Sequence, residues 1–279
     1  MDTLCEIPDE NLPALATLYE KHVVWAPHVL SLIHTGMRLK NTNKFRDSVS
    51  FLSVNEMWRE DGTIIVIMKF HCYNIFVFTL DDHCVTLRQA LLTTDFTNPQ
   101  AVFFCVHEKH LPTVEQVAKE RNLRLSKAPL PYLIFALNPS KATFALDCPP
   151  DVYVKKLDPT LSDKINSVWP HKYPGSENYV SGLIEMNGGY GVFLRSSNEM
   201  VAWVVKHCFG HIGVLQTDEK HKKKGYGSLV TRALALEILD EGHWPFGTVY
   251  PDNAGSIKLF EKLGFERIGF ASYMDIINT

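Results

Sequence analysis

A basic, glycine-bearing turn that opens into an apolar segment is the feature that most constrains how this chain folds. Residues 222–227 read Lys-Lys-Lys-Gly-Tyr-Gly, and the apolar pattern after them predicts a helix from Tyr226 to about Leu239. Such a turn directs several backbone N–H groups outward at the positive end of a helix dipole. The sequence therefore predicts a binding site for a compact anion such as a pyrophosphate.

A second block begins at Asn253, twenty-six positions after the turn. Residues 253–265 read Asn-Ala-Gly-Ser-Ile-Lys-Leu-Phe-Glu-Lys-Leu-Gly-Phe. Asn is a favoured helix cap and Gly a common helix stop, so the block predicts a strand end, a short helix and a stop before Phe265. A Gly-x-Gly turn or a lysine run is weak evidence alone, because both are common at turns and solvated faces. The order and contents of the two blocks together form the specific signal.

Together the blocks resemble the two acyl-CoA motifs of the GNAT superfamily of N-acyltransferases. That pattern is Arg/Gln-x-x-Gly-x-Gly/Ala, then Asn-x-x-Ala/Ser-x-x-Leu-Tyr/Phe-x-x-x-Gly-Phe. Here Lys222 stands where Arg or Gln is usual, and Phe260 where Tyr is usual. The resemblance implies an α/β (α+β) fold: a mixed, mostly antiparallel sheet flanked by helices.

The proline-rich stretch at 138–151 predicts a domain boundary, with one domain at 1–145 and a catalytic, acyl-CoA-binding GNAT domain at 150–279. The elements predicted after the boundary are strands at 152–157, 191–195, 200–207, 211–217 and 246–250, helices at 161–169, 177–186, 226–239 and 255–263, and a closing hairpin or strand at 265–277. This order is the one that the GNAT fold requires.

Two further stretches resemble the glycine N-acyltransferase family. Residues 166–203 carry Trp169, Tyr179-Val180, glycine turns and a hairpin that ends at Trp203, and residues 15–58 resemble that family's N-terminal region. Before the boundary, strands are predicted at 63–70, 74–80, 101–107 and 132–137, with a helix at 112–121. This half contains no basic glycine turn, so we expect a degenerate, non-catalytic GNAT-like partner domain.

Composition narrows the class of protein. A net charge of −3 over 279 residues argues against a nucleic-acid binder with an overall basic surface. Uninterrupted apolar runs such as residues 64–68 are too short to span a membrane, and no targeting segment is readable at the N-terminus. Six scattered cysteines suggest reduced thiols, and the three His-Cys dipeptides cannot readily share a metal, so no metal is expected. We expect a cytoplasmic protein, although the family resemblance leaves a mitochondrial location open.

The resemblance implies acyl-CoA or acetyl-CoA as co-substrate. The backbone of the strand at 212–217 would pair with the pantetheine arm, and an amide near Leu215 or Thr217 would polarise the thioester carbonyl. Tyr226 could equally anchor its helix in the core, and Asn253 could act only as a cap. The residues assigned to the cofactor are Leu215, Gln216, Thr217, Lys222, Lys223, Lys224, Gly225, Tyr226, Gly227, Ser228, Asn253, Ser256 and Phe260.

The general base is open between several residues. Glu219 lies near the carboxylate of glycine acyltransferase-like proteins but is displaced from it by one residue. His211, at the start of the strand, is the second candidate because imidazole suits proton transfer, and Glu185 and His207 are further ones. Phe260 cannot protonate the leaving thiolate, but a thiol of pKa about 8.5 leaves tolerably without help.

The sequence thus predicts an acyl-CoA-dependent N-acyltransferase whose acceptor is the amine of a small molecule such as the amino acid glycine. Two alternatives stay open. The acceptor could be a protein N-terminus or lysine, or the chain could be a catalytically silent acyl-CoA-binding module. No nucleic-acid or membrane partner is expected.

Overall fold

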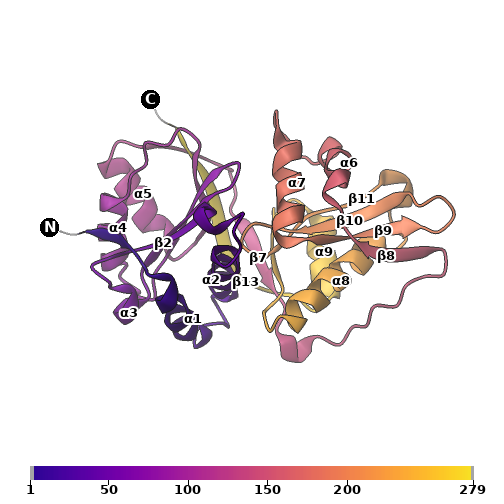
Figure 1. The fold of residues 1–279 in the computed structure, drawn as a ribbon, viewed down its shortest axis with the longest axis horizontal. Coiled ribbons are helices and arrows are strands. Elements are labelled where there is room, and N and C mark those ends of the chain that lie inside the picture. Colours follow the sequence, from indigo (N-terminus) through magenta and orange to yellow (C-terminus); the bar gives the residue numbers. More distant parts are fainter. Residues whose placement is uncertain (1–2, 278–279) are drawn as a thin grey trace. The chain divides into compact units, whose positions relative to one another are not determined.

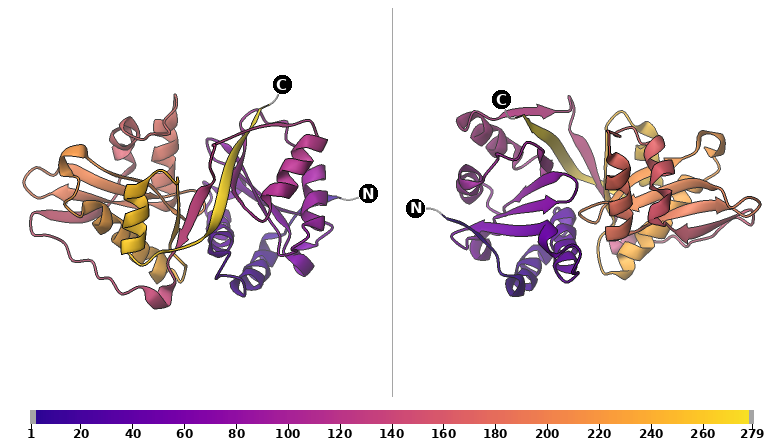
Figure 2. Two further views of the ribbon diagram at one scale, coloured as in Figure 1. Left: turned by 180° about the vertical axis from the view of Figure 1, so that it is seen from behind. Right: turned by 45° about the horizontal axis from the view of Figure 1, so that its top comes forward.

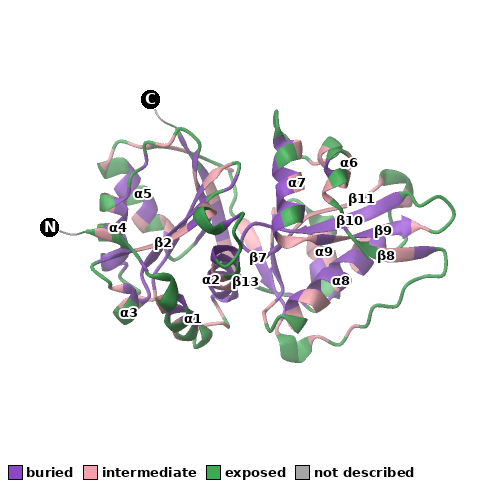
Figure 3. Cartoon of the chain, in the orientation of Figure 1, coloured by how far each residue is buried: buried purple, intermediate pink, exposed green. Residues whose placement is uncertain are grey.

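The chain folds into two compact units. The structure is a computed structural model and describes residues 3–277. Unit 1 contains the residues up to 133 together with those from 268 onward, and unit 2 contains residues 134–267. Buried residues concentrate along the strands and on the helix faces turned toward them (Figure 3).

The helices and strands follow one another closely along the chain (Figure 1). The elements of unit 1 are β1 (Leu4–Glu6), α1 (Leu12–Glu20), α2 (Pro27–Lys40), β2 (Val49–Val54), α3 (Trp58–Asp61), β3 (Ile64–Lys69), β4 (Tyr73–Phe78), α4 (Val85–Thr93), β5 (Ala101–His107), α5 (Leu111–Glu120) and β6 (Arg124–Lys127). Those of unit 2 are β7 (Tyr132–Ala136), whose first two residues belong to unit 1, β8 (Val152–Lys156), α6 (Ser162–Ser167), α7 (Ser176–Asn187), β9 (Gly189–Leu194), β10 (Met200–Lys206), β11 (Ile212–Thr217), α8 (Tyr226–Asp240), β12 (Phe246–Val249) and α9 (Ala254–Lys262). The long strand β13 (Glu266–Ile277) begins in unit 2 and continues in unit 1.

The sheet of unit 1 runs in the order β1-β2-β3-β4-β5-β13, and β6 pairs with β13. Neighbouring strands are antiparallel except β4 and β5, which are parallel. β3 is an Ile- and Val-rich run that is buried on both faces, as expected for a central strand covered on two sides. Both views in Figure 2 show the yellow β13 within this unit.

The sheet of unit 2 runs in the order β7-β12-β11-β10-β9-β8. From β8 to β11 each strand is antiparallel to the next, whereas β11 and β12 are parallel. Helices cover both faces, with α6 and α7 on one side and α8 and α9 on the other (Figure 1). Two adjacent residues mark these faces: Lys206 binds Glu241 just after α8, while His207 binds Tyr179 of α7.

The division between the two units falls after residues 133 and 267, whereas the sequence predicts one boundary at 145–150. The proline-rich stretch is extended, as its composition suggests, but the strand before it, β7, lies next to β12 in unit 2. Leu137 continues this attachment, because its N–H donates to the carbonyl of Pro245 at 2.8 Å. At the other end, Met274 and Ile276 are buried in the core of unit 1. Burial of apolar side chains therefore outweighs linker composition at both places.

Most of the predicted elements are present, with ends that differ by a few residues. The segment 265–277 is a strand rather than a hairpin, and the predicted helix at 161–169 is a 3₁₀ turn followed by the short α6. The sequence prediction did not include α1, α2, α3, α4, β1, β2 or β6. Among residues 3–277, no helix combines the length and the apolar composition needed to cross a membrane.

Candidate active site

The parallel strands β11 and β12 are paired near the start of β11 and then separate. Within the described part of the chain, their register contains the single pair Ile212 with Gly247. On its other edge β11 pairs with β10 from Ile212 to Thr217, with an irregularity at which Val214 adopts a positive φ of 50°. Residues 213–217 are all half-buried. β11 therefore offers a backbone edge that a ligand could continue as a strand-like partner.

The predicted basic turn lies directly after β11. A 3₁₀ turn (Glu219–His221) leads to Lys222, and α8 begins at Tyr226 without a side-chain cap. Gly225 has φ of 84°, a left-handed conformation that favours glycine, and a Cβ built on it would meet no atom within 4 Å. All three lysines of the turn are exposed. The start of α8 is thus open in front of Gly225, with three exposed lysines beside it, as binding of a phosphate requires.

Gly227 joins this turn to the rest of the site. A Cβ at Gly227 would lie 3.3 Å from Oγ1 of Thr217 at the end of β11, and 3.3 Å from Cδ1 of Leu259 in α9. The start of α8, the end of β11 and α9 therefore meet at a residue without a side chain. Ser228 follows in the first turn of α8 and is half-buried.

Two of the expected ligand side chains are engaged within the protein. Tyr226 is 3 % exposed and its hydroxyl donates to Oδ2 of Asp151 at 2.9 Å, so its side chain anchors α8 in the core. Asn253 accepts a hydrogen bond from the N–H of Ser256 at 3.0 Å through Oδ1 and thereby caps α9. Of the alternatives that the sequence left open for these residues, the structure shows the anchoring and the capping.

Phe260 lies where β11 and β12 are still paired. Its ring packs against Phe135 and Phe265 and is 3 % exposed. A Cβ on Gly247 would lie only 2.8 Å from Cε1 and Cζ of Phe260, so the ring covers the backbone of β12 at its pair with Ile212. The side chain at this position is therefore apolar, and it has no hydroxyl that could donate a proton.

The two principal base candidates lie at opposite ends of β11. Glu219 is on the surface beyond the C-terminal end, with its side chain 83 % exposed and 2.5 Å from Nζ of Lys222. His211 precedes the strand and is buried at 5 % exposure. Six strand residues separate these ends by roughly 20 Å. Glu219 therefore belongs to the basic turn, whereas His211 lies beside the point where β11 and β12 separate.

The remaining base candidates also differ in burial. Glu185 is exposed on α7. His207 is buried, and its ring lies 4.4 Å from that of His211 between centroids. Burial lowers the pKa of His207 to about 3, and burial together with His207 lowers the pKa of His211 well below its usual value of 6.5. Both imidazoles are therefore neutral at physiological pH.

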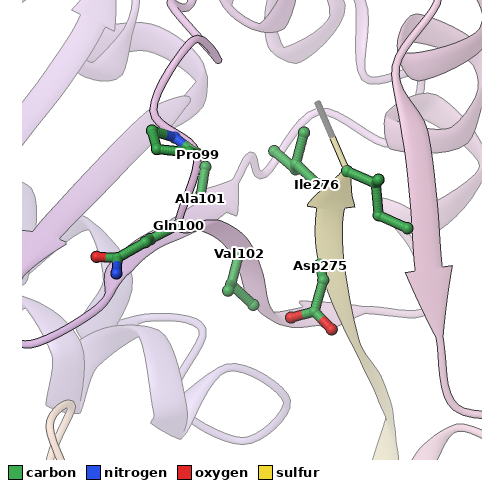
Figure 4. A pocket seen from close by; sticks show the side chains of 7 residues that line it. Pro99, Gln100, Ala101, Val102, Asp275 and Ile276 are labelled. Carbon is green, nitrogen blue, oxygen red and sulfur yellow. The ribbon is translucent and has the colours of Figure 1, made fainter. Parts of the chain in front are cut away.

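No group of His, Cys, Asp or Glu side chains within residues 3–277 is arranged to hold a metal ion. A pocket of about 360 Å³ in unit 1 also differs from an anion site, because its lining includes a carboxylate and no lysine or arginine (Figure 4). Its lining residues are Pro99, Gln100, Ala101, Val102, Asp275, Ile276 and Ile277.

Comparison with known proteins defines the fold. Residues 189–274 match the family model described as FR47-like protein, and residues 3–117 match one described as a domain of unknown function. A Drosophila protein of known structure superposes with a TM-score of 0.86 and 19% identity over 99% of each chain. No curated protein sequence matches the chain.

Two acetyltransferase structures share this arrangement over the whole chain. A GCN5-related N-acetyltransferase from Sphaerobacter thermophilus superposes with a TM-score of 0.56 and 8% identity, over 100% of this chain and 96% of that one. A tandem GNAT protein from the clavulanic acid biosynthesis pathway gives 0.51 and 10%, over 100% and 99%. The chain therefore has the mixed α/β GNAT fold, with an open sheet flanked by helices, as the two sequence motifs predict.

Sequence reasoning missed two glycines, Gly213 and Gly247, and the contacts of one further glycine and one tyrosine that shape this site. Gly213, Gly227 and Gly247 each permit a close approach, to the histidine rings, to α9 and to Phe260 respectively. Of these, Gly227 was expected only to approach a phosphate. Tyr179, buried beside His207, was noted only as part of the family resemblance. Glycines within predicted strands were the available signal for Gly213 and Gly247.

Proposed function

We propose that this protein is an acyl-CoA-dependent N-acyltransferase. The separation of β11 from β12 carries the proposal, because it leaves a strand edge of pantetheine length beside a basic helix start. In this arrangement the N–H groups of 225–228 and the lysines of the turn bind the pyrophosphate. The pantetheine arm continues the sheet along 213–217, and one of these amides polarises the thioester carbonyl.

The proposed cofactor site lies within unit 2. The comparable strand–turn–helix of unit 1, between β4 and α4, lacks its basic character. There Asp81 accepts hydrogen bonds from the N–H groups of His83 and Val85, both at 2.9 Å. A carboxylate thus occupies the start of α4, where an anion would otherwise bind. We infer that unit 1 is a degenerate, non-catalytic GNAT-like partner.

We propose a small amine as the acceptor, with an amino acid such as glycine as the first choice. The likeness of residues 166–203 to the glycine N-acyltransferase family supports this choice. A protein N-terminus or lysine is the second choice. The silent-module alternative is favoured by two observations, the apolar Phe260 and the pairing of Glu219 with Lys222. Only turnover separates it from an enzyme, because both would bind acyl-CoA alike.

The test combines turnover with binding. Release of free CoA thiol is measured for the full-length protein across a panel of acyl-CoA donors, amino acids, other amines and peptides. Turnover with an amino acid supports the proposal, and turnover with peptides alone would move the acceptor to proteins. Binding of acyl-CoA without turnover for any pair would establish the silent module instead.

A pair of glycine variants tests the location of the cofactor. Gly225→Val should weaken acyl-CoA binding by at least about tenfold in calorimetry, because its side chain projects into the space in front of α8. Gly242→Val is the matched control. Gly242 lies just beyond the other end of α8, with a similar φ of 81° and equally open surroundings. Both variants bear similar backbone strain, so equal affinities in the two would contradict the assignment.

A further inference from the structure

We propose that His211 accepts the proton of the attacking amine and that Tyr179, acting through His207, is the positioning residue that holds this histidine in place. The inference rests on the proposed function and adds the proton acceptor and its support. It also moves the first choice of base from Glu219 to the other end of β11.

The two histidines are held on a closed turn between β10 and β11. The N–H of His207 donates to the carbonyl of His211 at 2.8 Å, and the N–H of Gly210 donates to the carbonyl of His207 at 2.9 Å. Phe209 packs on the ring of His211 with centroids 4.2 Å apart, and Phe246 lies 5.8 Å from it. The rings are therefore fixed by both backbone and packing.

Both rings lie directly against Gly213. A Cβ at Gly213 would be 3.3 Å from Cδ2 of His207 and 3.4 Å from Nε2 of His211. Gly213 is the first residue of β11 beyond its pair with β12. A thioester bound along 213–217 would therefore bring its reacting end close to His211, whereas Glu219 lies near the phosphates.

Tyr179 secures His207 from the α7 face. Its hydroxyl and Nε2 of His207 share a hydrogen bond of 3.1 Å, and the amide of Asn187 donates to the carbonyl of His207 at 2.6 Å. The ring of Tyr179 is stacked on Trp169, with centroids 6.1 Å apart and planes 18° apart. Tyr179 thus connects the histidine pair to the loop between α6 and α7.

His211 has an unused hydrogen-bonding atom. No residue within 3–277 provides a partner for its buried Nδ1. A buried polar atom without a partner destabilises the fold, so its retention at this point favours a role in binding or chemistry. Two effects lower the pKa of His211, its burial and the neighbouring ring of His207. Both favour the neutral imidazole that a proton acceptor requires.

The step balances without a further reactant. The lone pair of the neutral amine forms a bond to the thioester carbon, and the carbon–sulfur bond breaks with its electron pair on sulfur. As the new bond forms, the amine nitrogen becomes positively charged and far more acidic, so that a weakly basic imidazole can take its proton. The imidazolium returns this proton to water, and water protonates the thiolate to give an amide and CoA thiol.

The experiment compares His211→Gln, Tyr179→Phe and Tyr190→Phe in the full-length protein. His211→Gln should lower kcat by about 10²-fold or more. Tyr179→Phe, which keeps the stacked ring and removes one hydrogen bond, should lower kcat about three- to tenfold with acyl-CoA affinity unchanged. Tyr190→Phe is the control, since it also removes a tyrosine hydrogen bond in unit 2, the partly buried one to Glu237 at 2.8 Å, away from the site.

Chemical rescue separates catalysis from folding. Imidazole added to His211→Ala should restore part of kcat, which a merely structural histidine would not show. Unchanged kcat in His211→Gln, or equal losses in Tyr179→Phe and Tyr190→Phe, would overturn the inference while leaving the proposed function intact. Absence of wild-type turnover with every donor and amine would overturn both.

Discussion

Acid should destabilise this protein at a pH where its carboxylates are still charged, because several histidines are buried as neutral rings. In unit 1, burial and neighbouring charges lower the pKa of His107 to about 4 and that of His110 to about 3. In unit 2, burial lowers the pKa of His207 to about 3. His28, stacked on His107, and His211 are shifted in the same direction.

The sign and size of the effect follow from proton linkage. A histidine in the unfolded chain binds its proton below pH 6.5, whereas the folded protein does not until the pH reaches the lowered value. The unfolded state therefore takes up protons first, and stability is lost as the pH falls from 6.5 toward 4. Each histidine with a folded pKa of 3 to 4 contributes a loss of about 2 kcal/mol at pH 5. Three such residues amount to roughly 6 kcal/mol, comparable to the whole stability of a typical domain.

The assay is urea unfolding followed by tryptophan fluorescence between pH 7 and pH 5. His110→Gln should lose about 2 kcal/mol less than the wild type over this range, whatever its stability at pH 7. His83→Gln, at an exposed position nearby, should follow the wild type. A free energy of unfolding that stays constant within about 1 kcal/mol, or the same pH slope in His110→Gln, would refute the reasoning.

Four further substitutions test the packing and chemistry of unit 2. Gly189→Ala places a Cβ 2.4 Å from the carbonyl oxygen of Val204 and should cost more than about 2 kcal/mol in thermal unfolding, whereas Gly255→Ala in the open first turn of α9 should be neutral or stabilising by up to about 1 kcal/mol. Phe260→Tyr should change kcat by less than about tenfold, because the thiolate leaves without help; a larger gain would show that acid catalysis limits the enzyme. Tyr226→Phe should cost about 1 kcal/mol and leave acyl-CoA affinity unchanged, and a large loss of affinity would make its hydroxyl a ligand.

The sequence predicted those parts of the site that depend on local backbone chemistry. A glycine at the left-handed start of α8, the lysines beside it and an Asn that caps α9 are all determined by neighbours within a few residues. The order of strands and helices in unit 2 followed from the same local patterns. Such features can be predicted because short-range geometry decides them.

The features that were not predicted depend on residues far apart in the chain. Nothing near Tyr226 indicates that Asp151, 75 positions away, accepts its hydroxyl. Nor can a hydrophobic pattern distinguish a His-Cys pair in a loop from one whose imidazole lies against a glycine on the next strand. The exchange of strands at the domain boundary was missed for the same reason, since linker composition is local and sheet pairing is not.

The passage of β13 from unit 2 into unit 1 affects how the chain can fold during synthesis. β5 and β6 are completed by residues 268–277, which leave the ribosome only after the whole of unit 2. Domains generally fold as units from the N-terminus during synthesis. Here the first unit must instead wait, with a sheet edge uncovered, for a strand that is translated more than 130 residues later. A fragment that ends or begins at the proline-rich stretch would thus contain an incomplete sheet. Chaperones that shield exposed strand edges should matter more for this protein than for a protein whose domain boundary coincides with its linker.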